Sequence, residues 1–351
     1  MPSADDNIAH YLPTVAALHP FVKAVVFPHE RDHMNRVSYT HLTFSQLNDQ
    51  CDRFAHGLRK TGIEPGTRVL LMVRPSLDFF ALTFALFKIG AIPILIDPGM
   101  GSRGFMRCVR QANPTALIGI PAAHILRLVC RRAFQSVTIP ITLGKRLFWG
   151  GTALHELDCR DGPFEVAAVC PDDLAAVLFT TGSTGPAKGV QYTHRVFCTQ
   201  TEILRREYGI GPGDVDLPCF PLFALFSTAL GATAVIPDMD PSRPAHVDPT
   251  RIIEPILNHG VTYSFGSPTL WNRVGSYCVA HGIQLPTLRR ILMAGAPVPG
   301  IVHERLLSEV LPVGAETFTP YGATESLPVA NFRGSEMVRE TWQATNRGAG
   351  M

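Results

Sequence analysis

Short apolar runs alternate with helical patterns along the first third of the chain. Runs at Val69–Val73, Ile92–Ile96 and Ala116–Ile120 are typical of strands buried on both faces. Helices are predicted at 77–90 and 105–112, and a further helix over 43–62 begins at a capping box of Thr43 and Gln46. This order of elements predicts a mostly parallel sheet covered by helices, and therefore the α/β class.

A second alternating block follows a weakly patterned stretch over 125–172, which we expect to be variable surface structure. Thr193 can cap a helix that runs to about Tyr208. The remaining predicted elements are a buried helix at 223–231, a strand at 234–236, a Pro-rich loop at 238–249, a helix to His259, and strands at 261–265 and 291–294. Both of these last strands end in a Gly/Pro turn, where open α/β sheets bind ligands.

The stretch AAVLFTTGSTGPAKGVQYT, from Ala175 to Thr193, is the first candidate for chemistry. An apolar strand there leads into a loop of hydroxyls, glycines and one lysine, namely Thr180, Thr181, Gly182, Ser183, Thr184, Gly185, Lys188 and Gly189. Such a loop suits a polyanion, because glycine lets backbone N–H groups approach it while hydroxyls and a lysine add donors and charge. It is not a Walker A motif. Plain surface connections have a similar composition, so composition leaves both interpretations open.

Length and composition bound the class of protein. The 351 residues, 46% of them hydrophobic and 17% charged, predict a globular chain of two or more packed units. A net charge of +2 gives no argument for a nucleic-acid partner or a membrane surface. Eight cysteines without any C-x-x-C pair fit reduced thiols, and the apolar stretches 79–96 and 222–236 are interrupted or too short to span a bilayer. We expect a cytoplasmic protein with no signal peptide.

The segment His29–His33 reads H-E-R-D-H, which matches the H-E-x-x-H motif of zinc proteases. That motif binds zinc only on a helix, where the two histidines share a face. Here Pro28 precedes it and polar residues surround it, so we predict a loop, a chance match and no zinc site.

Three motifs together carry a resemblance to a known family. FTTGSTGPAKGV, MAGAP (Met293–Pro297) and YGATES (Tyr321–Ser326) resemble, in this order, the signature set of the adenylate-forming superfamily of acyl-CoA synthetases, luciferases and nonribosomal adenylation domains. The resemblance implies the N-terminal domain of that fold, with two packed α/β subdomains and mostly parallel sheets. We expect these subdomains at about 60–195 and at 10–59 plus 196–330.

The resemblance also implies ATP and Mg²⁺ as cofactors and assigns roles at matching positions. Thr180, Thr181, Gly182, Ser183, Thr184, Gly185 and Lys188 would hold the β- and γ-phosphates, and Gly295, Ala296, Pro297, Tyr321 and Gly322 would border adenine. Thr324 would reach the α-phosphate, and Glu325 with Thr184 would hold Mg²⁺. Lys188, Thr324 and Glu325 are thus the expected catalytic residues. His194 is expected to be structural.

A narrower resemblance concerns the acid substrate. FPLFALFSTALGA, IPDMDPSRPA and LIDPGMG resemble the OleC-type β-lactone synthetases of bacterial long-chain olefin synthesis, and Ala224 stands where many acyl-CoA synthetases carry the histidine of PLFH. Expected substrate residues are Phe223, Ala224, Phe226, Gly266 and Ser267. Phe223, Phe226 and Trp271 fit either an acyl tunnel or ordinary core packing.

Three functions follow from the resemblance. The first is activation of a long-chain 2-alkyl-3-hydroxy fatty acid as its acyl-AMP, followed by intramolecular β-lactone formation. The second is a long-chain fatty-acyl-CoA or acyl-AMP ligase, and the third is a nucleotide-binding remnant without catalysis. A complex with other enzymes of olefin synthesis is left open. Residues 331–351 would begin a barrel and linker, and because the family's C-terminal lid domain is absent from this sequence, we expect weak activity or none from the chain alone.

Overall fold

The computed structural model describes residues 2–180, 188–323 and 326–342. The chain divides into two compact α/β units, Met1–Val22 with Leu42–Ile203, and Lys23–His41 with Leu204–Met351. This division differs from the expected one at 10–22, 42–59 and 196–203, which lie in the first unit rather than the second. For 42–59 the reason is packing, because helix α2 (Phe44–Lys60) lies against helix α3 (Leu77–Ile89) of the first unit.

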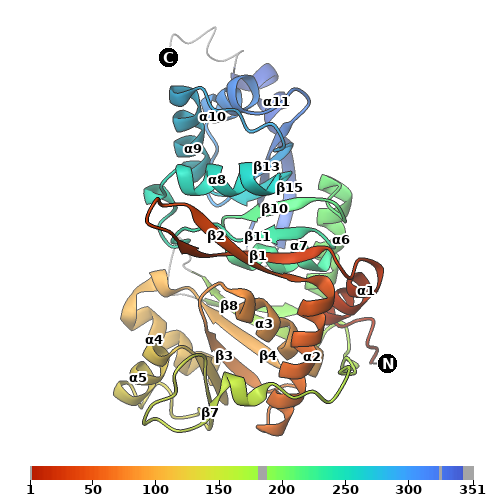
Figure 1. The fold of residues 1–351 in the computed structure, drawn as a ribbon, viewed down its shortest axis with the longest axis vertical. Coiled ribbons are helices and arrows are strands. Elements are labelled where there is room, and N and C mark those ends of the chain that lie inside the picture. Colours follow the sequence, from red (N-terminus) through yellow and green to blue (C-terminus); the bar gives the residue numbers. More distant parts are fainter. Residues whose placement is uncertain (1, 181–187, 324–325, 343–351) are drawn as a thin grey trace. The chain divides into compact units, whose positions relative to one another are not determined.

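Unit 1 is built on a seven-stranded sheet of order β7-β6-β5-β3-β4-β8-β9 (Figure 1). Its strands are β3 (Arg68–Met72), β4 (Ile92–Ile96), β5 (Ala116–Gly119), β6 (Ile139–Thr142), β7 (Thr152–Ala153), β8 (Leu174–Thr180) and β9 (Lys188–Thr193). Every pair is parallel except β8 with β9. The expected parallel sheet is confirmed.

The helices of unit 1 cover both faces of this sheet. They are α1 (Tyr11–Leu18), α2, α3, α4 (Gly101–Ala112), α5 (Pro121–Val129) and the start of α6 (His194–Tyr208). The chain passes from β3 to β4 in one direction and back across β3 to β5 in the other, so right-handed crossovers place α3 and α4 on opposite faces. Phe134, after α5, packs with Val109 of α4 and Leu70 of β3 in one core cluster.

The sequence predicted most of these elements, with one correction. The capping box is confirmed, since the Gln46 N–H donates to Thr43 Oγ1 at 3.3 Å and the Thr43 N–H to Gln46 Oε1 at 2.9 Å. The expectation of variable surface structure over 125–172 was wrong, because most of α5 and all of β6 and β7 lie there. Their short lengths explain the weak pattern, since two to four residues carry little periodicity.

Helices α2 and α3 are joined by a buried ion pair between Lys88 and Asp52. The Lys88 side chain is 1% exposed, and its Nζ also donates to Asn48 Oδ1 at 2.7 Å. The Asn48 Nδ2 group donates in turn to Asp52 Oδ2 at 3.2 Å. The lysine that interrupts the apolar stretch 79–96 is therefore a partnered core residue.

Unit 2 carries an eight-stranded sheet of order β15-β14-β13-β12-β10-β11-β1-β2. Its strands are β1 (Lys23–Arg31), β2 (Val37–Thr43), β10 (Val215–Pro218), β11 (Thr233–Val235), β12 (Tyr263–Gly266), β13 (Arg290–Met293), β14 (Glu316–Ala323) and β15 (Ser326–Arg333). The six strands from β14 to β1 pair in parallel, and β14 pairs antiparallel with β15. Strands β1, β2, β10, β14 and β15 were not predicted.

The helices of unit 2 surround a core centred on Trp271, Ile256 and Leu306. They are the end of α6, α7 (Ala224–Ala229), α8 (Thr250–His259), α9 (Pro268–His281), α10 (Gly300–Arg305) with the π-helical turn η6 (Leu306–Val310), α11 (Gly334–Glu336) and η7 (Met337–Trp342). In the part of the chain that the structure describes, no helix combines the length and apolarity needed to cross a membrane.

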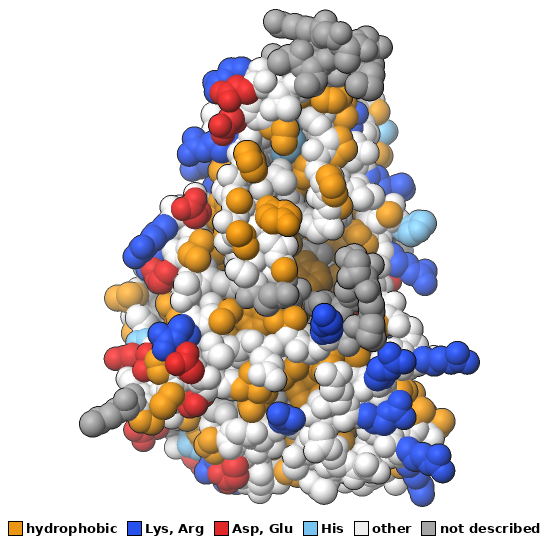
Figure 2. Space-filling model, turned by 180° about the vertical axis from the view of Figure 1, so that it is seen from behind, with side chains coloured by type: hydrophobic (Ala, Val, Ile, Leu, Met, Phe, Trp, Pro, Cys, Tyr) orange, Lys and Arg blue, Asp and Glu red, His pale blue; other side chains and the backbone are white. Residues whose placement is uncertain are grey.

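Although the net charge is small, the charged residues are unevenly distributed along the chain. Residues 98–155 contain seven arginines and one lysine but neither aspartate nor glutamate. This segment supplies α4, β5, α5, β6 and β7 of unit 1. Figure 2 shows Lys and Arg side chains gathered at the lower right, on the side of unit 1 that carries α4 and α5.

The Lys88–Asp52 pair allows a test of this fold. We expect Lys88→Ala to lower the free energy of unfolding by about 3–5 kcal/mol, because it leaves the Asp52 carboxylate buried without its counter-ion. The double change Lys88→Met with Asp52→Leu should cost less than Lys88→Ala alone. Urea denaturation measures both, and Lys60→Ala, which breaks an exposed pair with Asp161, is the control that should change little. Equal costs for the three variants would contradict a buried pair.

Candidate functional site

The expected binding residues of unit 2 follow the carboxyl ends of four neighbouring parallel strands. The pairs Pro218 with Phe265, Gly266 with Met293, and Leu292 with Phe318 place β10, β12, β13 and β14 in register. The segments after β10, β12 and β13 begin at Cys219, Ser267 and Ala294, and Tyr321 lies within the last three residues of β14. The structure thus brings the candidate residues of unit 2 to one edge of its sheet, where open α/β sheets bind ligands.

The expected adenine-binding residues lie at the ends of β13 and β14. Gly295, Ala296 and Pro297 form an exposed turn, and Gly295 takes a positive φ of 91° that favours glycine. Tyr321 is 70% exposed in β14. At Gly322 a Cβ atom would lie 2.4 Å from the Ser326 carbonyl oxygen, so the close β14–β15 connection requires glycine. An exposed aromatic ring suits stacking on a planar heterocycle.

A cluster of phenylalanines lies at the ends of β10 and β12. The rings of Phe223 and Phe265 stack with centroids 3.8 Å apart and an interplanar angle of 15°. Phe220 and Phe226 lie against Phe223 at 5.8 and 5.9 Å. Phe223 and Phe226 are half-buried and Phe220 is 40% exposed, so the cluster offers an apolar surface. Phe220 and Phe265 were not predicted, although both directly precede candidate segments.

The other expected substrate residues are engaged in the fold. Ala224 is fully buried, and Ser267 caps α9 by accepting a hydrogen bond from the Leu270 N–H at 3.2 Å. A Cβ atom on Gly266 would lie 2.9 Å from Trp271 Nε1. Trp271 itself is fully buried in the main core of unit 2, so of the two interpretations offered by the sequence it takes the packing role.

A buried carboxyl group holds α7, the helix that carries Phe226, against strand β10. Ser227 Oγ donates to Asp216 Oδ2 at 2.5 Å, while Asp216 Oδ1 has no hydrogen-bond partner among the described residues. Burial raises the pKa of Asp216 to about 8, since the charged form loses its hydration. Asp216 is therefore protonated at neutral pH. This role was not predicted from the sequence.

Another buried contact fixes the strand that carries Tyr321. His303 of α10 is fully buried, and its Nδ1 and Nε2 atoms lie 2.8 Å and 3.2 Å from the hydroxyls of Thr317 and Thr319 in β14. Burial lowers the pKa of His303 to about 4, so the ring is neutral at pH 7. His303 thus positions β14 rather than providing charge. This role of His303 was not predicted, because a single histidine in a helical pattern is typical of a surface position.

In unit 1 the candidate phosphate loop connects two paired strands. Thr180 ends β8 and pairs with Lys188, the first residue of β9, and the Lys188 side chain is exposed. Strand β8 runs parallel to β4, and the Asp97 N–H donates to the Phe179 carbonyl at 3.1 Å. The loop therefore starts at the carboxyl end of a parallel strand. The predicted residues Thr181, Gly182, Ser183, Thr184 and Gly185 lie outside the described residues, as do Thr324 and Glu325.

His194, at the start of α6, is a structural residue as expected. Its side chain is buried and its Nδ1 atom accepts a hydrogen bond from the Ile8 N–H at 3.3 Å. Burial lowers the pKa of His194 to about 4, so the ring stays neutral at pH 7.

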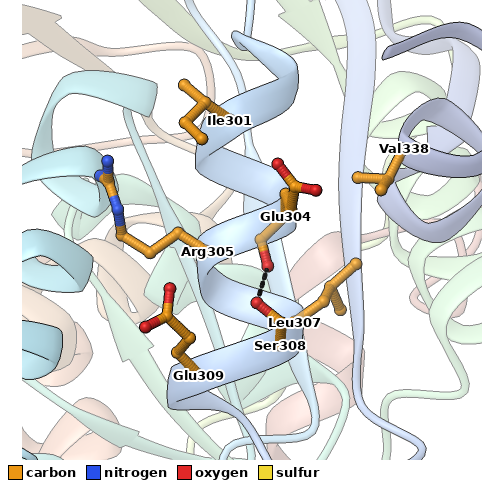
Figure 3. A pocket seen from close by; sticks show the side chains of 7 residues that line it. All are labelled: Ile301, Glu304, Arg305, Leu307, Ser308, Glu309 and Val338. Atoms are coloured by element: carbon orange, nitrogen blue, oxygen red, sulfur yellow. Dashed lines mark hydrogen bonds between the residues drawn. The ribbon is translucent and has the colours of Figure 1, made fainter. Parts of the chain in front are cut away.

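A groove of about 530 Å³ lies on another part of unit 2, between α10 with η6 and the segment η7 (Figure 3). It is lined by Ile301, Glu304, Arg305, Leu307, Ser308, Glu309 and Val338. Two of its polar side chains are already used, since Ser308 Oγ donates to the Glu304 carbonyl at 2.7 Å and Glu304 Oε2 accepts from Trp342 Nε1 at 3.0 Å. None of the predicted site residues lines this groove.

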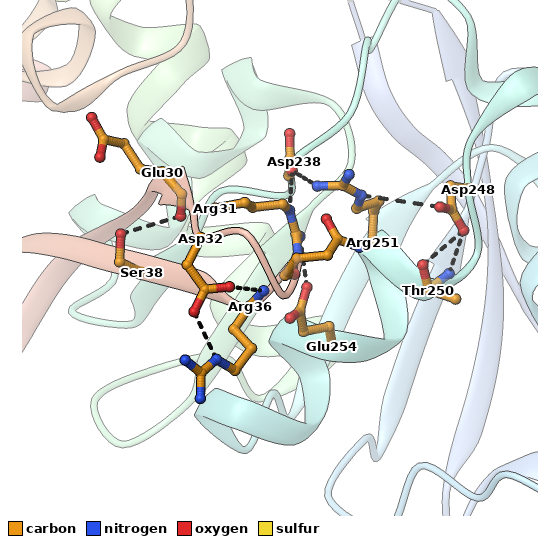
Figure 4. Close-up of polar contacts among 11 residues, drawn as sticks. Glu30, Arg31, Asp32, Arg36, Ser38, Asp238, Asp248, Thr250, Arg251 and Glu254 are labelled. Carbon is orange, nitrogen blue, oxygen red and sulfur yellow. Dashed lines mark hydrogen bonds and ion pairs between the residues drawn. The ribbon is translucent and has the colours of Figure 1, made fainter.

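The H-E-x-x-H segment is not helical, and it begins in a strand rather than in the predicted loop. His29 and Glu30 lie in β1, and Arg31, which ends this strand, makes the contacts that Figure 4 shows. Arg31 Nη2 donates to Glu254 Oε2 of α8 at 2.6 Å, and Arg31 Nε donates to Asp238 Oδ2 at 3.1 Å. Arg31 thus ties the β1–β2 hairpin to α8. Without a helix, His29 and His33 do not form the face that zinc proteases use.

Comparison with known proteins identifies the family. Residues 15–350 match the family model described as AMP-binding enzyme. The chain belongs to this family. Two curated relatives of this AMP-binding chain are named olefin beta-lactone synthetase: that of Stenotrophomonas maltophilia is 48% identical over 98% of this chain, and that of Xanthomonas campestris pv. campestris is 45% identical over 98%. The chain spans 62% and 61% of their respective lengths.

A solved structure supports the fold of the AMP-binding chain. The inhibitor-bound N-terminal domain of FACL13 from Mycobacterium tuberculosis superposes with a TM-score of 0.76, covering 97% of this chain and 80% of that domain. At 21% sequence identity this likeness concerns the fold alone. The expected fold, the N-terminal domain of the adenylate-forming enzymes, is confirmed.

The buried carboxyl of Asp216 predicts how stability depends on pH. Between pH 4 and pH 8 the native state keeps a proton that the unfolded state releases, so the free energy of unfolding falls as pH rises. Asp216→Asn keeps an acceptor for Ser227 and removes this titration. We expect the variant to be more stable than the parent by about 1–3 kcal/mol at pH 8.5, with a smaller gain at pH 5.

Urea denaturation at several pH values measures this dependence. Asp49→Asn makes the same substitution at an exposed position of α2 and should leave the slope with pH unaltered. A gain for Asp216→Asn that is independent of pH would show that Asp216 is ionised in the folded protein.

Proposed function

We propose that this chain provides the ATP- and acid-binding part of an olefin β-lactone synthetase. The substrate is a long-chain 2-alkyl-3-hydroxy fatty acid, which is activated as acyl-AMP and closed to a β-lactone with release of pyrophosphate and AMP. Identity of 48% and 45% to two proteins of that name, over 98% of the chain, is the observation that carries the proposal. Because those relatives are longer, the activity is proposed for the whole protein.

The positions of the described residues support the nucleotide part of the proposal. In this assignment the turn Gly295–Pro297 and the exposed Tyr321 ring border adenine, with Gly322 allowing a close backbone approach. Lys188, exposed at the start of β9, contacts the β- and γ-phosphates together with the loop from Thr180 to Gly185. Thr324 reaches the α-phosphate. Glu325 and Thr184 would hold Mg²⁺, which would supply positive charge beside the leaving pyrophosphate.

The phenylalanine cluster supports the acid part of the proposal. Phe220, Phe223, Phe226 and Phe265 present aromatic surface in the segments that follow β10 and end β12. The residues assigned to the nucleotide lie at the ends of β13 and β14, the next two strands along the same edge. Burying an alkyl chain on such rings contributes about 0.8 kcal/mol per methylene group, which favours long acids over short ones.

The chemistry needs no nucleophilic side chain. One oxygen of the substrate carboxylate attacks the α-phosphorus, and the bond between the α-phosphorus and the bridging oxygen breaks to release pyrophosphate. The 3-hydroxyl oxygen of the same molecule then attacks the acyl carbon, loses its proton and displaces AMP. Because the hydroxyl is held beside the mixed anhydride, ring closure requires no second acceptor. The task of the chain is to position two polyanions and neutralise the leaving charge.

Exchange of labelled pyrophosphate into ATP tests the activation step. With protein in excess and a 2-alkyl-3-hydroxy acid present, we expect Lys188→Ala to slow the exchange roughly 10²–10³-fold, because one cation no longer stabilises the leaving phosphate. Lys145→Ala removes another exposed lysine of unit 1 and should leave the rate unchanged. Equal rates for the parent and Lys188→Ala would refute the assignment of Lys188. Nucleotide binding by calorimetry, measured in parallel, separates lost binding from a slower reaction.

A further inference from the structure

One face of unit 1 combines positive charge with exposed apolar side chains, and neither contributes to the proposed site. Arg103, Arg107 and Arg110 are spaced i, i+4 and i+7 along α4, so they share one face of that helix, and all three are exposed. Arg131 and Arg132 follow α5, and Lys145 lies in the loop before β7. All three of these side chains are exposed as well.

The apolar members of this face are exposed to an unusual degree. Ile125 and Val129 are spaced i, i+4 on α5 and are 48% and 76% exposed. Leu147 and Phe148, at the tip of the loop, are 47% and 80% exposed. We call the surface made by these four residues and the six cations above the basic face.

The basic face is held together as one surface of unit 1. Helix α4 and the segment after α5 share a core cluster that includes Val109 and Phe134. The loop is fixed to α5, because Trp149 stacks on His124 with ring centroids 5.5 Å apart and the Trp149 carbonyl accepts from Arg127 Nη2 at 3.1 Å. The Phe148 ring lies edge-on to Trp149, with centroids 5.4 Å apart, and is 80% exposed.

No carboxylate neutralises these cations. Residues 98–155 contain no acid, and among the described residues none of the six cations of the basic face makes an ion pair. The neighbouring Arg146 differs, since its Nη1 atom pairs with Glu156 Oε2 at 2.8 Å. Figure 2 shows this side of unit 1 with Lys and Arg side chains and without a red patch among them.

We propose that the basic face binds the surface of a bilayer that contains anionic phospholipids. Arginine and lysine side chains would contact the headgroup phosphates, while Val129, Leu147 and Phe148 enter the boundary between headgroups and acyl chains. The combination of cations with exposed aliphatic side chains favours a lipid surface over nucleic acid. Nucleic acid would be met by cations and stacking aromatics, whereas aliphatic side chains exposed among cations are typical of proteins that lie on lipid. This inference does not depend on the proposed activity.

Cosedimentation with vesicles tests the proposal. We expect the chain to sediment with phosphatidylcholine vesicles that contain 30% phosphatidylglycerol and to remain in the supernatant with pure phosphatidylcholine. Raising NaCl from 0.05 to 0.5 M should weaken binding, because salt screens the headgroup charge.

Arg103→Gln with Arg107→Gln and Arg110→Gln should lower the partition coefficient at least about tenfold, since each cation near the surface contributes to binding. Val129→Ser with Phe148→Ser should weaken binding in both salt conditions.

A triple variant with the same charge change elsewhere is the control. Arg160→Gln with Arg206→Gln and Arg243→Gln removes three exposed cations outside the basic face and should bind vesicles like the parent. Thermal unfolding of every variant verifies that the fold is retained. Vesicle binding that both triple variants lose equally would overturn the proposal, as would absence of binding by the folded parent. Binding of a fluorescent duplex or single-stranded oligonucleotide, without binding to anionic vesicles, would identify a nucleic-acid surface instead and would also overturn it.

Discussion

The parallel pairing of β10, β12, β13 and β14 is the constraint on which the candidate site of unit 2 depends. Parallel strands end at the same edge, so residues almost a hundred positions apart, such as Phe226 after β10 and Tyr321 in β14, lie along one edge of the sheet. Strands β10, β12 and β13 are mostly buried on both faces, as is typical of parallel strands covered by helices. The polar and aromatic segments after these strands are then placed by the sheet itself.

Both sheets change from parallel to antiparallel at one end, and a signature motif lies at each change. In unit 1 the motif FTTGSTGPAKGV connects β8 to the antiparallel β9, with Thr180 paired to Lys188. In unit 2 the motif YGATES connects β14 to the antiparallel β15, with Ala323 paired to Ser326. An antiparallel partner needs no crossover helix, so each motif lies at the carboxyl end of a parallel strand. That position is suited to binding anions and polar ligands.

How much the sequence predicts depends on where the deciding contact lies. Local patterns were enough for α2, with its capping box at Thr43, and for the buried strand β4. They failed for β10 and β14, because a four-residue strand and a strand with Pro320 and Gly322 carry weak patterns. The motifs named Lys188 and Tyr321 as candidate site residues, and the structure places Lys188 at the start of β9 and Tyr321 near the end of β14. The roles of His303 and Asp216 depend on partners distant in the sequence, Thr317 and Ser227, and no spacing rule identifies such contacts.

The most direct test of the proposed function is the mass of the product. The chain, or a longer form that includes the segment present in its relatives, is incubated with ATP, Mg²⁺ and a 2-alkyl-3-hydroxy acid, with and without coenzyme A. The account predicts a product 18 Da lighter than the acid, formed with one AMP per product and independent of coenzyme A, because the hydroxyl of the acid is the acceptor. A thioester that forms only with coenzyme A would contradict it and would identify a fatty-acyl-CoA ligase.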